Sequence, residues 1–183
     1  MDIAAMKKVI LLVSFVIPVL LINAQTVGKS TATEKDFAFS YGLELAYPLE
    51  ILHKGHIMGV GAYGQSDYIL SEAASLTSSA GIIYFPGKQI TVTNSSQTYK
   101  TKQKGYFAGI ILGGLKFYLN DNRFYGHSQV GISIDNSGIL AAVYTVKIGI
   151  EKKKVDWSFG FQSASRAGGN YSFLGIKAGY RIP

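Results

Sequence analysis

Ten polar side chains stand at alternate positions in segments that are otherwise mostly apolar, and together they could form one ionic network. They are Glu44, Lys116, His127, Gln129, Lys147, Glu151, Asp156, Gln162, Lys177 and Arg181. In β-strands alternate residues share one face, so these groups would meet inside a closed sheet. Buried charges need partners, because an unpaired one costs several kcal/mol. We therefore predict a structural network of salt bridges and hydrogen bonds, with a proton or ion path as the alternative.

The adjacent residues His127 and Ser128 have the types of a general base and a nucleophile. Neighbouring strand residues point to opposite faces, so the two would not meet, and a His-x-Ser spacing would be required. Gly59, Gly61 and Gly64 match the dinucleotide-binding fingerprint in form, but nothing helical follows them, so we interpret them as packing glycines of a strand. We predict no catalytic residues and no cofactor.

The chain has no cysteine, which excludes disulfides, thiolate metal sites and a cysteine nucleophile. Its three histidines, His53, His56 and His127, are scattered, and no cluster of His, Asp and Glu has metal-ligand spacing. We predict no metal site, and we expect His53 and His56 on a loop surface.

The segment 86–104 carries lysines without any acidic residue, and they are Lys88, Lys100, Lys102 and Lys104. On an outer loop, these lysines would attract the phosphates of lipopolysaccharide, with a strength that depends on salt. The alternative is an unselective solvated loop or a β-extension.

The N-terminus has the pattern of an export signal. Lys7 and Lys8 precede an apolar run, 9–22, which is interrupted by Pro18 and followed by a small-residue cleavage site at Ala24. We predict a signal peptide over 1–24 rather than an uncleaved anchor, because the run is short for a spanning helix. The polar segment 25–36 is interpreted as a flexible leader, and 37–183 as one domain.

Removing residues 1–24 takes away two of the 18 basic and one of the 11 acidic residues, so the net charge becomes +6. A basic exported protein favours anionic surfaces such as lipid phosphates. Nucleic acid is the weaker interpretation, because an exported chain leaves the cytoplasm.

Eight segments alternate apolar and polar residues, and we interpret them as the strands of an all-β protein. They are 37–47, 56–65, 78–85, 106–119, 123–134, 140–151, 155–162 and 174–182, and the facing of the second and third is ambiguous. The predicted fold is an eight-stranded antiparallel up-and-down transmembrane barrel, with large apolar side chains facing lipid. A soluble lipocalin-like barrel would instead point them inward. The polar set is rich in small residues, as a narrow lumen requires, which favours the membrane barrel.

An even strand number places both chain ends on the periplasmic side. The expected periplasmic turns are 67–75, 120–122 and 151–154, and the outer connections are 48–55, 86–104, 135–138 and 167–170. This topology predicts an outward-facing aromatic girdle near the periplasmic ends of the strands, formed by Phe37, Phe39, Phe117, Phe124, Trp157 and Tyr180.

The segment 112–134, LGGLKFYLNDNRFYGHSQVGISI, resembles the strand-turn-strand of small eight-stranded outer-membrane proteins, and 174–182, LGIKAGYRI, resembles their last strand. These are the OmpX-like, OmpW-like and "porin family" barrels common in Bacteroidetes. The resemblance implies an outer-membrane location, contact with outer-membrane lipid and the outer-membrane assembly machinery, and a monomer. Many such proteins end on an aromatic residue that this machinery reads, whereas here Tyr180 precedes Arg181-Ile182-Pro183.

The interior of an eight-stranded barrel is only wide enough to be filled by side chains, so open diffusion is not expected. We predict a non-enzymatic outer-membrane barrel with a structural or surface-binding role through its extracellular loops. The alternatives are a narrow channel for ions or small solutes, an enzyme acting on envelope lipids, and a soluble lipocalin-like binding protein.

Overall fold

A computed structural model describes residues 37–94, 97–119, 124–166 and 169–182. The predicted signal peptide, 1–24, and leader, 25–36, lie outside the described residues. Within the described ranges, no helix is long and apolar enough to cross a bilayer.

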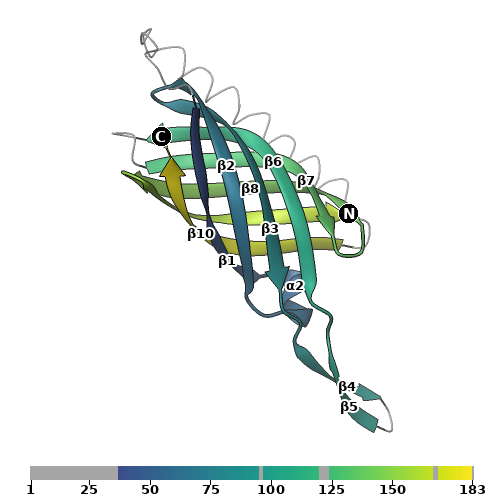
Figure 1. Cartoon of the computed structure of the whole chain (residues 1–183). Helices are drawn as coiled ribbons and strands as arrows, with labels where there is room; N and C mark the ends of the chain where they lie inside the picture. The colour runs from purple at the N-terminus through teal and green to yellow at the C-terminus, as the bar shows by residue number, and fades with distance from the viewer. Residues whose placement is uncertain (1–36, 95–96, 120–123, 167–168, 183) are drawn as a thin grey trace. The chain divides into compact units, whose positions relative to one another are not determined.

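The described residues form a closed antiparallel barrel of eight strands in the order β1-β10-β9-β8-β7-β6-β3-β2 (Figure 1). The strands are β1 (Phe37–Pro48), β2 (Gly59–Ser71), β3 (Ala74–Phe85), β6 (Tyr106–Leu119), β7 (Phe124–Asp135), β8 (Leu140–Lys152), β9 (Val155–Arg166) and β10 (Gly169–Ile182). The first and last strands pair from Phe39 with Ile182 to Pro48 with Phe173, which closes the sheet. The predicted up-and-down fold is confirmed.

The hairpin of β2 and β3 is longer than predicted. Residues 67–75 were expected to form a turn, but β2 continues to Ser71 and β3 begins at Ala74, so Glu72 and Ala73 alone connect them. Asp67 was interpreted as a turn residue, yet it is buried in the lumen, where a carboxylate can meet a lysine. The polar residue therefore continues the strand pattern instead of ending it.

Two of the outer connections contain regular structure. A short helix, α2 (Glu50–Gly55), joins β1 to β2, and a two-stranded sheet, β4 (Gln89–Asn94) with β5 (Gln97–Lys102), joins β3 to β6. The segment 86–104 is thus the β-extension that the sequence left as an alternative. Both elements lie at the same end of the barrel (Figure 1).

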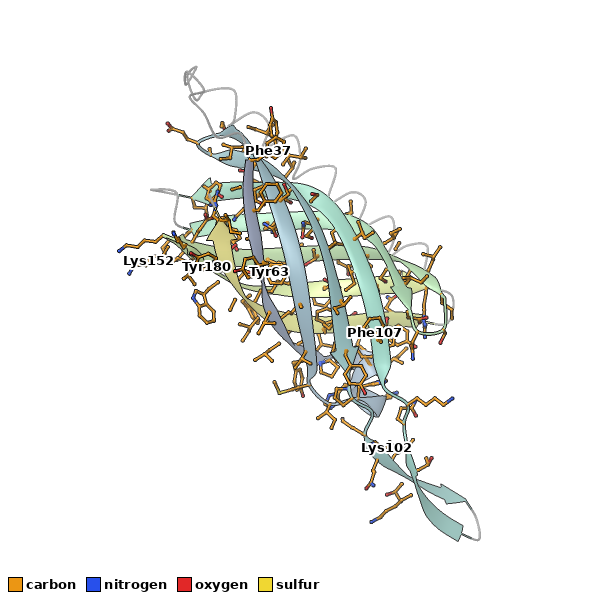
Figure 2. The ribbon with its side chains drawn as sticks, in the orientation of Figure 1. Phe37, Tyr63, Lys102, Phe107, Lys152 and Tyr180 are labelled. Carbon is orange, nitrogen blue, oxygen red and sulfur yellow. The ribbon has the colours of Figure 1, made fainter. Side chains whose placement is uncertain are left out.

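The outer surface of the barrel is apolar, whereas most side chains in its interior are polar. Trp157 and Ile176 are 52% and 51% exposed, whereas Lys147 and Lys177 are 5% and 7% exposed. A lipocalin-like fold would show the reverse, so the structure contradicts that alternative. Phe37 and Tyr180 project from the outer surface (Figure 2).

The two strands whose facing was ambiguous follow the same rule. In β2, Gln65 and Asp67 face the lumen, and in β3 Ser75, Thr77 and Ser79 do so. The predicted girdle residues lie near one end of the barrel, where Phe124, Trp157 and Tyr180 are exposed and Phe117 is half-buried.

Candidate functional site: a filled lumen and a basic hairpin

Lys116 is the centre of an ionic cluster near the end of the barrel that carries the short turns. Its side chain on β6 is 1% exposed, and its Nζ lies 2.9 Å from Glu151, 3.4 Å from Asp67 and 3.6 Å from Asp156. The ammonium also sits 4.0 Å from the ring centroid of Tyr125, a cation-π contact. One buried cation therefore holds carboxylates from β2, β8 and β9 together.

Further donors complete this cluster. The guanidinium of Arg181 pairs with Oε1 of Glu151, and the hydroxyl of Tyr118 donates to Oε2 of the same carboxylate at 3.1 Å. The hydroxyl of Tyr125 donates to Asp156 at 2.5 Å, and a Cβ at Gly149 would collide with the Tyr125 ring. A glycine is needed on the lumen face of β8 so that this ring can lie there.

The middle of the lumen is bridged by hydrogen bonds between side chains. His127 Nε2 lies 2.8 Å from the hydroxyl of Thr77, and the amide of Gln129 donates to Thr77 at 3.2 Å and to Ser79 at 3.1 Å. Lys147 donates to Oε1 of Gln129 at 3.2 Å. These bonds tie β3, β7 and β8 across the interior.

On the opposite wall, Lys177 pairs with Glu44 at 3.3 Å. The two residues face each other in the register of β1 and β10, and a Cβ at Gly175 would lie 2.5 Å from Oε1 of Glu44. The Lys177 ammonium also lies 4.5 Å from the ring centroid of Tyr63.

Of the ten residues predicted to share the lumen, nine are buried and Arg181 is half-buried. Gln162 lies beside Lys147 and Lys177 at a small cavity. Sequence reasoning did not include Asp67, Thr77, Ser79, Tyr63 and Tyr125, which complete the cluster. For Asp67, Tyr63, Thr77 and Ser79 the signal was the period-two pattern of β2 and β3, which is weak because the lumen-facing stretches of those strands carry few large apolar residues. Tyr125 lies on β7, two residues before His127, so it shares the lumen face of that strand.

The other end of the lumen is closed by apolar side chains. Leu52 of α2 is 1% exposed and packs in a cluster with Ala46, Ile83, Phe85, Ala108 and Phe173. The rings of Phe85 and Phe173 lie 5.5 Å apart. Burial of this cluster is favourable at about 25 cal/mol per Å² of apolar surface, so α2 acts as a cover held by hydrophobic packing.

Hydrogen bonds fasten α2 to the base of the β4–β5 hairpin. The ring nitrogens of His56 lie 3.2 Å from the carbonyl oxygen of Leu52 and 3.1 Å from that of Lys104. Lys88 donates through Nζ to the carbonyl oxygen of His53 at 2.6 Å. The expectation of a surface position holds for His53 but is wrong for His56, which is buried because it bridges these segments.

A second polar cluster lies at the same end. Arg166 pairs with Asp135 and stands 4.0 Å over the ring of Tyr171, which stacks on Tyr106 at 5.2 Å. Asp135 also accepts from the backbone of Ser137 at 2.8 Å, which shapes the turn after β7. Asp135 was predicted in the outer connection 135–138, whereas Arg166 and Tyr171 fell outside every predicted strand and connection, so this pair was not predicted.

The exposed lysines of the hairpin form the remaining candidate site. Lys100, Lys102 and Lys104 are exposed, and the register pairs Lys100 with Thr91 and Lys102 with Gln89. Figure 2 shows Lys102 on the hairpin, away from the barrel wall. Lys88, predicted as a member of this group, is half-buried and engaged with α2 instead.

The candidate catalytic pair is separated by the barrel wall. His127 is buried in the lumen and Ser128 is exposed on the outer surface, as the strand alternation predicts. The glycines at 59–64 lie within β2. No group of three His, Asp or Glu side chains in the described ranges could hold a metal ion.

No family model and no curated protein matches the chain. Solved structures do match. Ail of Yersinia pestis in complex with the heparin analogue sucrose octasulfate has a TM-score of 0.55 and 12% identity, over 82% of this chain and 100% of Ail. Neisserial surface protein A (NspA) has a TM-score of 0.52 and 12% identity, over 81% of this chain and 97% of NspA. The chain therefore shares the fold of these small outer-membrane barrels.

Proposed function

We propose that the protein is a non-enzymatic outer-membrane barrel that acts through its extracellular loops, chiefly by binding anionic lipopolysaccharide with the β4–β5 hairpin. This proposal rests mainly on one combination of features. The barrel has an apolar outer wall and a lumen filled by side chains, and an exposed basic hairpin extends from one of its ends. The filled lumen argues against an aqueous path among the described residues, and the hairpin would present positive charge outside the membrane.

An outer-membrane location is supported by the outer wall. The large apolar side chains of Leu43, Val130 and Ile148 are 69%, 63% and 66% exposed. Exposure of so many apolar side chains is unfavourable in water and favourable in the hydrocarbon region of a bilayer. We infer that the chain is a monomer inserted by the outer-membrane assembly machinery, with Tyr180 as an outward aromatic near the end of β10.

The channel alternative is opposed by the packing of the lumen. A cavity of about 10 Å³ lies between Glu44, Lys147 and Lys177, close to the lower limit for one water molecule. The ionic cluster of Lys116 lies on one side of it and the apolar cluster of Leu52 on the other. We expect no discrete conductance in planar lipid bilayers. Reproducible single-channel steps would contradict the proposal and favour the channel.

Binding of lipopolysaccharide by the hairpin is supported by the local charge. Segment 86–104 has no acidic residue, and its lysines Lys100, Lys102 and Lys104 are exposed. Basic residues near an anionic lipid surface contribute about 1 kcal/mol each. The Ail structure contains the polyanionic heparin analogue sucrose octasulfate, which supports the search for an anionic ligand in this fold.

The test is a variant that removes this charge, Lys100→Gln with Lys102→Gln and Lys104→Gln. At about 1 kcal/mol per lysine, binding of lipopolysaccharide micelles at low salt should weaken on the order of 100-fold. The matched control changes Lys152, Lys153 and Lys154 to Gln, because these exposed lysines lie at the end of β8 and in the turn to β9, at the other end of the barrel. Equal losses in the two variants, or none in the first, would reject the hairpin as the binding site.

The enzyme alternative has a separate readout. A lipid-modifying enzyme would change the mass of lipid A when the protein is overproduced, and we expect the mass to stay the same. A mass shift would overturn the non-enzymatic proposal without bearing on the hairpin.

A further inference from the structure

Lys147 differs from the other basic residues of the lumen in its partners. Lys116, Lys177 and Arg181 each pair with a carboxylate. Lys147 is 5% exposed, and no carboxylate of the described residues lies within 4.0 Å of its Nζ, whose hydrogen bond is to Oε1 of Gln129 at 3.2 Å. An ammonium has three N–H donors, and the bond to Gln129 uses one of them.

Thr145 adds an unused hydroxyl to the same place. It lies two residues before Lys147 on β8, so both side chains face the lumen. Thr145 is 1% exposed, and its Oγ1 has no hydrogen-bond partner among the described residues. Both residues line the cavity of about 10 Å³. A buried polar atom without a partner is unfavourable, which points to a missing acceptor or donor there.

The charge around this cavity is unbalanced. Its wall contains two ammonium groups, Lys147 and Lys177, and one carboxylate, Glu44. Glu44 is engaged by Lys177 at 3.3 Å. The carboxylate of Asp156, on the neighbouring strand β9, contacts Lys116 at 3.6 Å and accepts from Tyr125 at 2.5 Å. The cavity therefore has one more positive group than negative groups in contact with it.

We propose that this cavity binds a single small inorganic anion of the halide class, held by the ammonium of Lys147, the hydroxyl of Thr145 and the second ammonium of Lys177. A halide accepts hydrogen bonds only, which matches a wall with unused donors. The cavity of about 10 Å³ is close to the lower limit for one water molecule, so a monatomic anion requires only a small displacement of the flexible side chains of Lys147 and Lys177, and a polyatomic anion requires far more. Phosphate and sulfate are too large. A water molecule would satisfy Thr145 but leave the charge of Lys147 without a counterion.

The direct test is crystallography of the refolded wild-type protein grown in sodium bromide. The expected result is an anomalous bromide peak in the cavity, within hydrogen-bond distance of Lys147 Nζ and Thr145 Oγ1. Density for a water without anomalous signal, or an empty cavity, would overturn the proposal and indicate that Lys147 is held as a neutral amine.

A second test measures the linkage between halide and stability. The protein is unfolded by urea in detergent, in chloride or gluconate at equal ionic strength, because gluconate is too large for the cavity. At a chloride concentration ten times the dissociation constant, the unfolding equilibrium constant should fall about tenfold. Lys147→Met and Thr145→Val should reduce or abolish this dependence, whereas Lys100→Met on the exposed hairpin should keep it. The same chloride response in all four proteins would reject the site, as would none in the wild type.

Discussion

Lys116→Met is expected to destabilise the barrel by about 3–5 kcal/mol, the range for removing one partner of a buried ion pair. The physical reason is that Lys116 Nζ is shared by the carboxylates of Glu151 at 2.9 Å and Asp67 at 3.4 Å. Methionine keeps most of the side-chain volume, so the loss would report the charge rather than a cavity. The carboxylates of Glu151 and Asp67 would remain buried without their shared cation.

Urea unfolding in detergent, followed by the mobility difference between unboiled and boiled protein on a gel, measures this loss. Lys152→Met is the matched control, because the same chemical change at an exposed residue at the end of β8 should alter the stability by no more than about 0.5 kcal/mol. Adding Glu151→Gln to Lys116→Met should restore part of the stability, since one uncompensated charge is then removed. A loss below about 1 kcal/mol for Lys116→Met would show that the ionic cluster does not support the fold.

Val130→Arg is expected to destabilise the protein in lipid by about 2–4 kcal/mol, the cost of a cation on the lipid face near the bilayer midplane. Val130 is 63% exposed and lies in the middle of β7, so the substitution changes no lumen contact. In water such an exposed position would accept arginine with little effect. The experiment therefore separates a membrane wall from a soluble surface.

The measurement is unfolding by guanidinium in phospholipid vesicles. Val155→Arg provides the control, because Val155 is also exposed but begins β9 at one end of the barrel, where the cost falls to about 0–1 kcal/mol. Equal effects at the two positions would contradict the placement of the β7 centre at the bilayer midplane.

For most strands the sequence predicts which residues point outward, because each residue of the barrel wall faces either the apolar exterior or the polar lumen. In β1 the exposed Tyr41 and Leu43 alternate with the buried Ser40 and Glu44, and the prediction of this pattern is confirmed. A shift of one residue in the register of a strand would move its whole apolar face into the lumen, so the alternation fixes which face points outward. The same alternation predicts that Lys116 and Lys147 face the interior, and they are 1% and 5% exposed.

The extent of the second and third strands was not readable, because small residues such as Gly64 and Ser78 carry little apolar contrast. Asp67 shows the consequence. Aspartate is common in turns and also pairs with lysines, so its residue type alone does not say whether it ends a strand or faces the lumen. The helix α2 was missed for a related reason. Its six residues are too few for a helical period, and Leu52 is buried only because Phe85 and Phe173 surround it.

The sequence by itself therefore determined which side chains face the lumen in the strands with a strong apolar contrast, such as β1 and β8, since period two is a local property of each strand. Only the tertiary structure decided which of those side chains meet. The register of eight strands places Glu44 opposite Lys177 and leaves Lys147 beside Thr145 and a cavity. Pairing across the lumen depends on distances between strands far apart in the chain, and no local pattern carries that information.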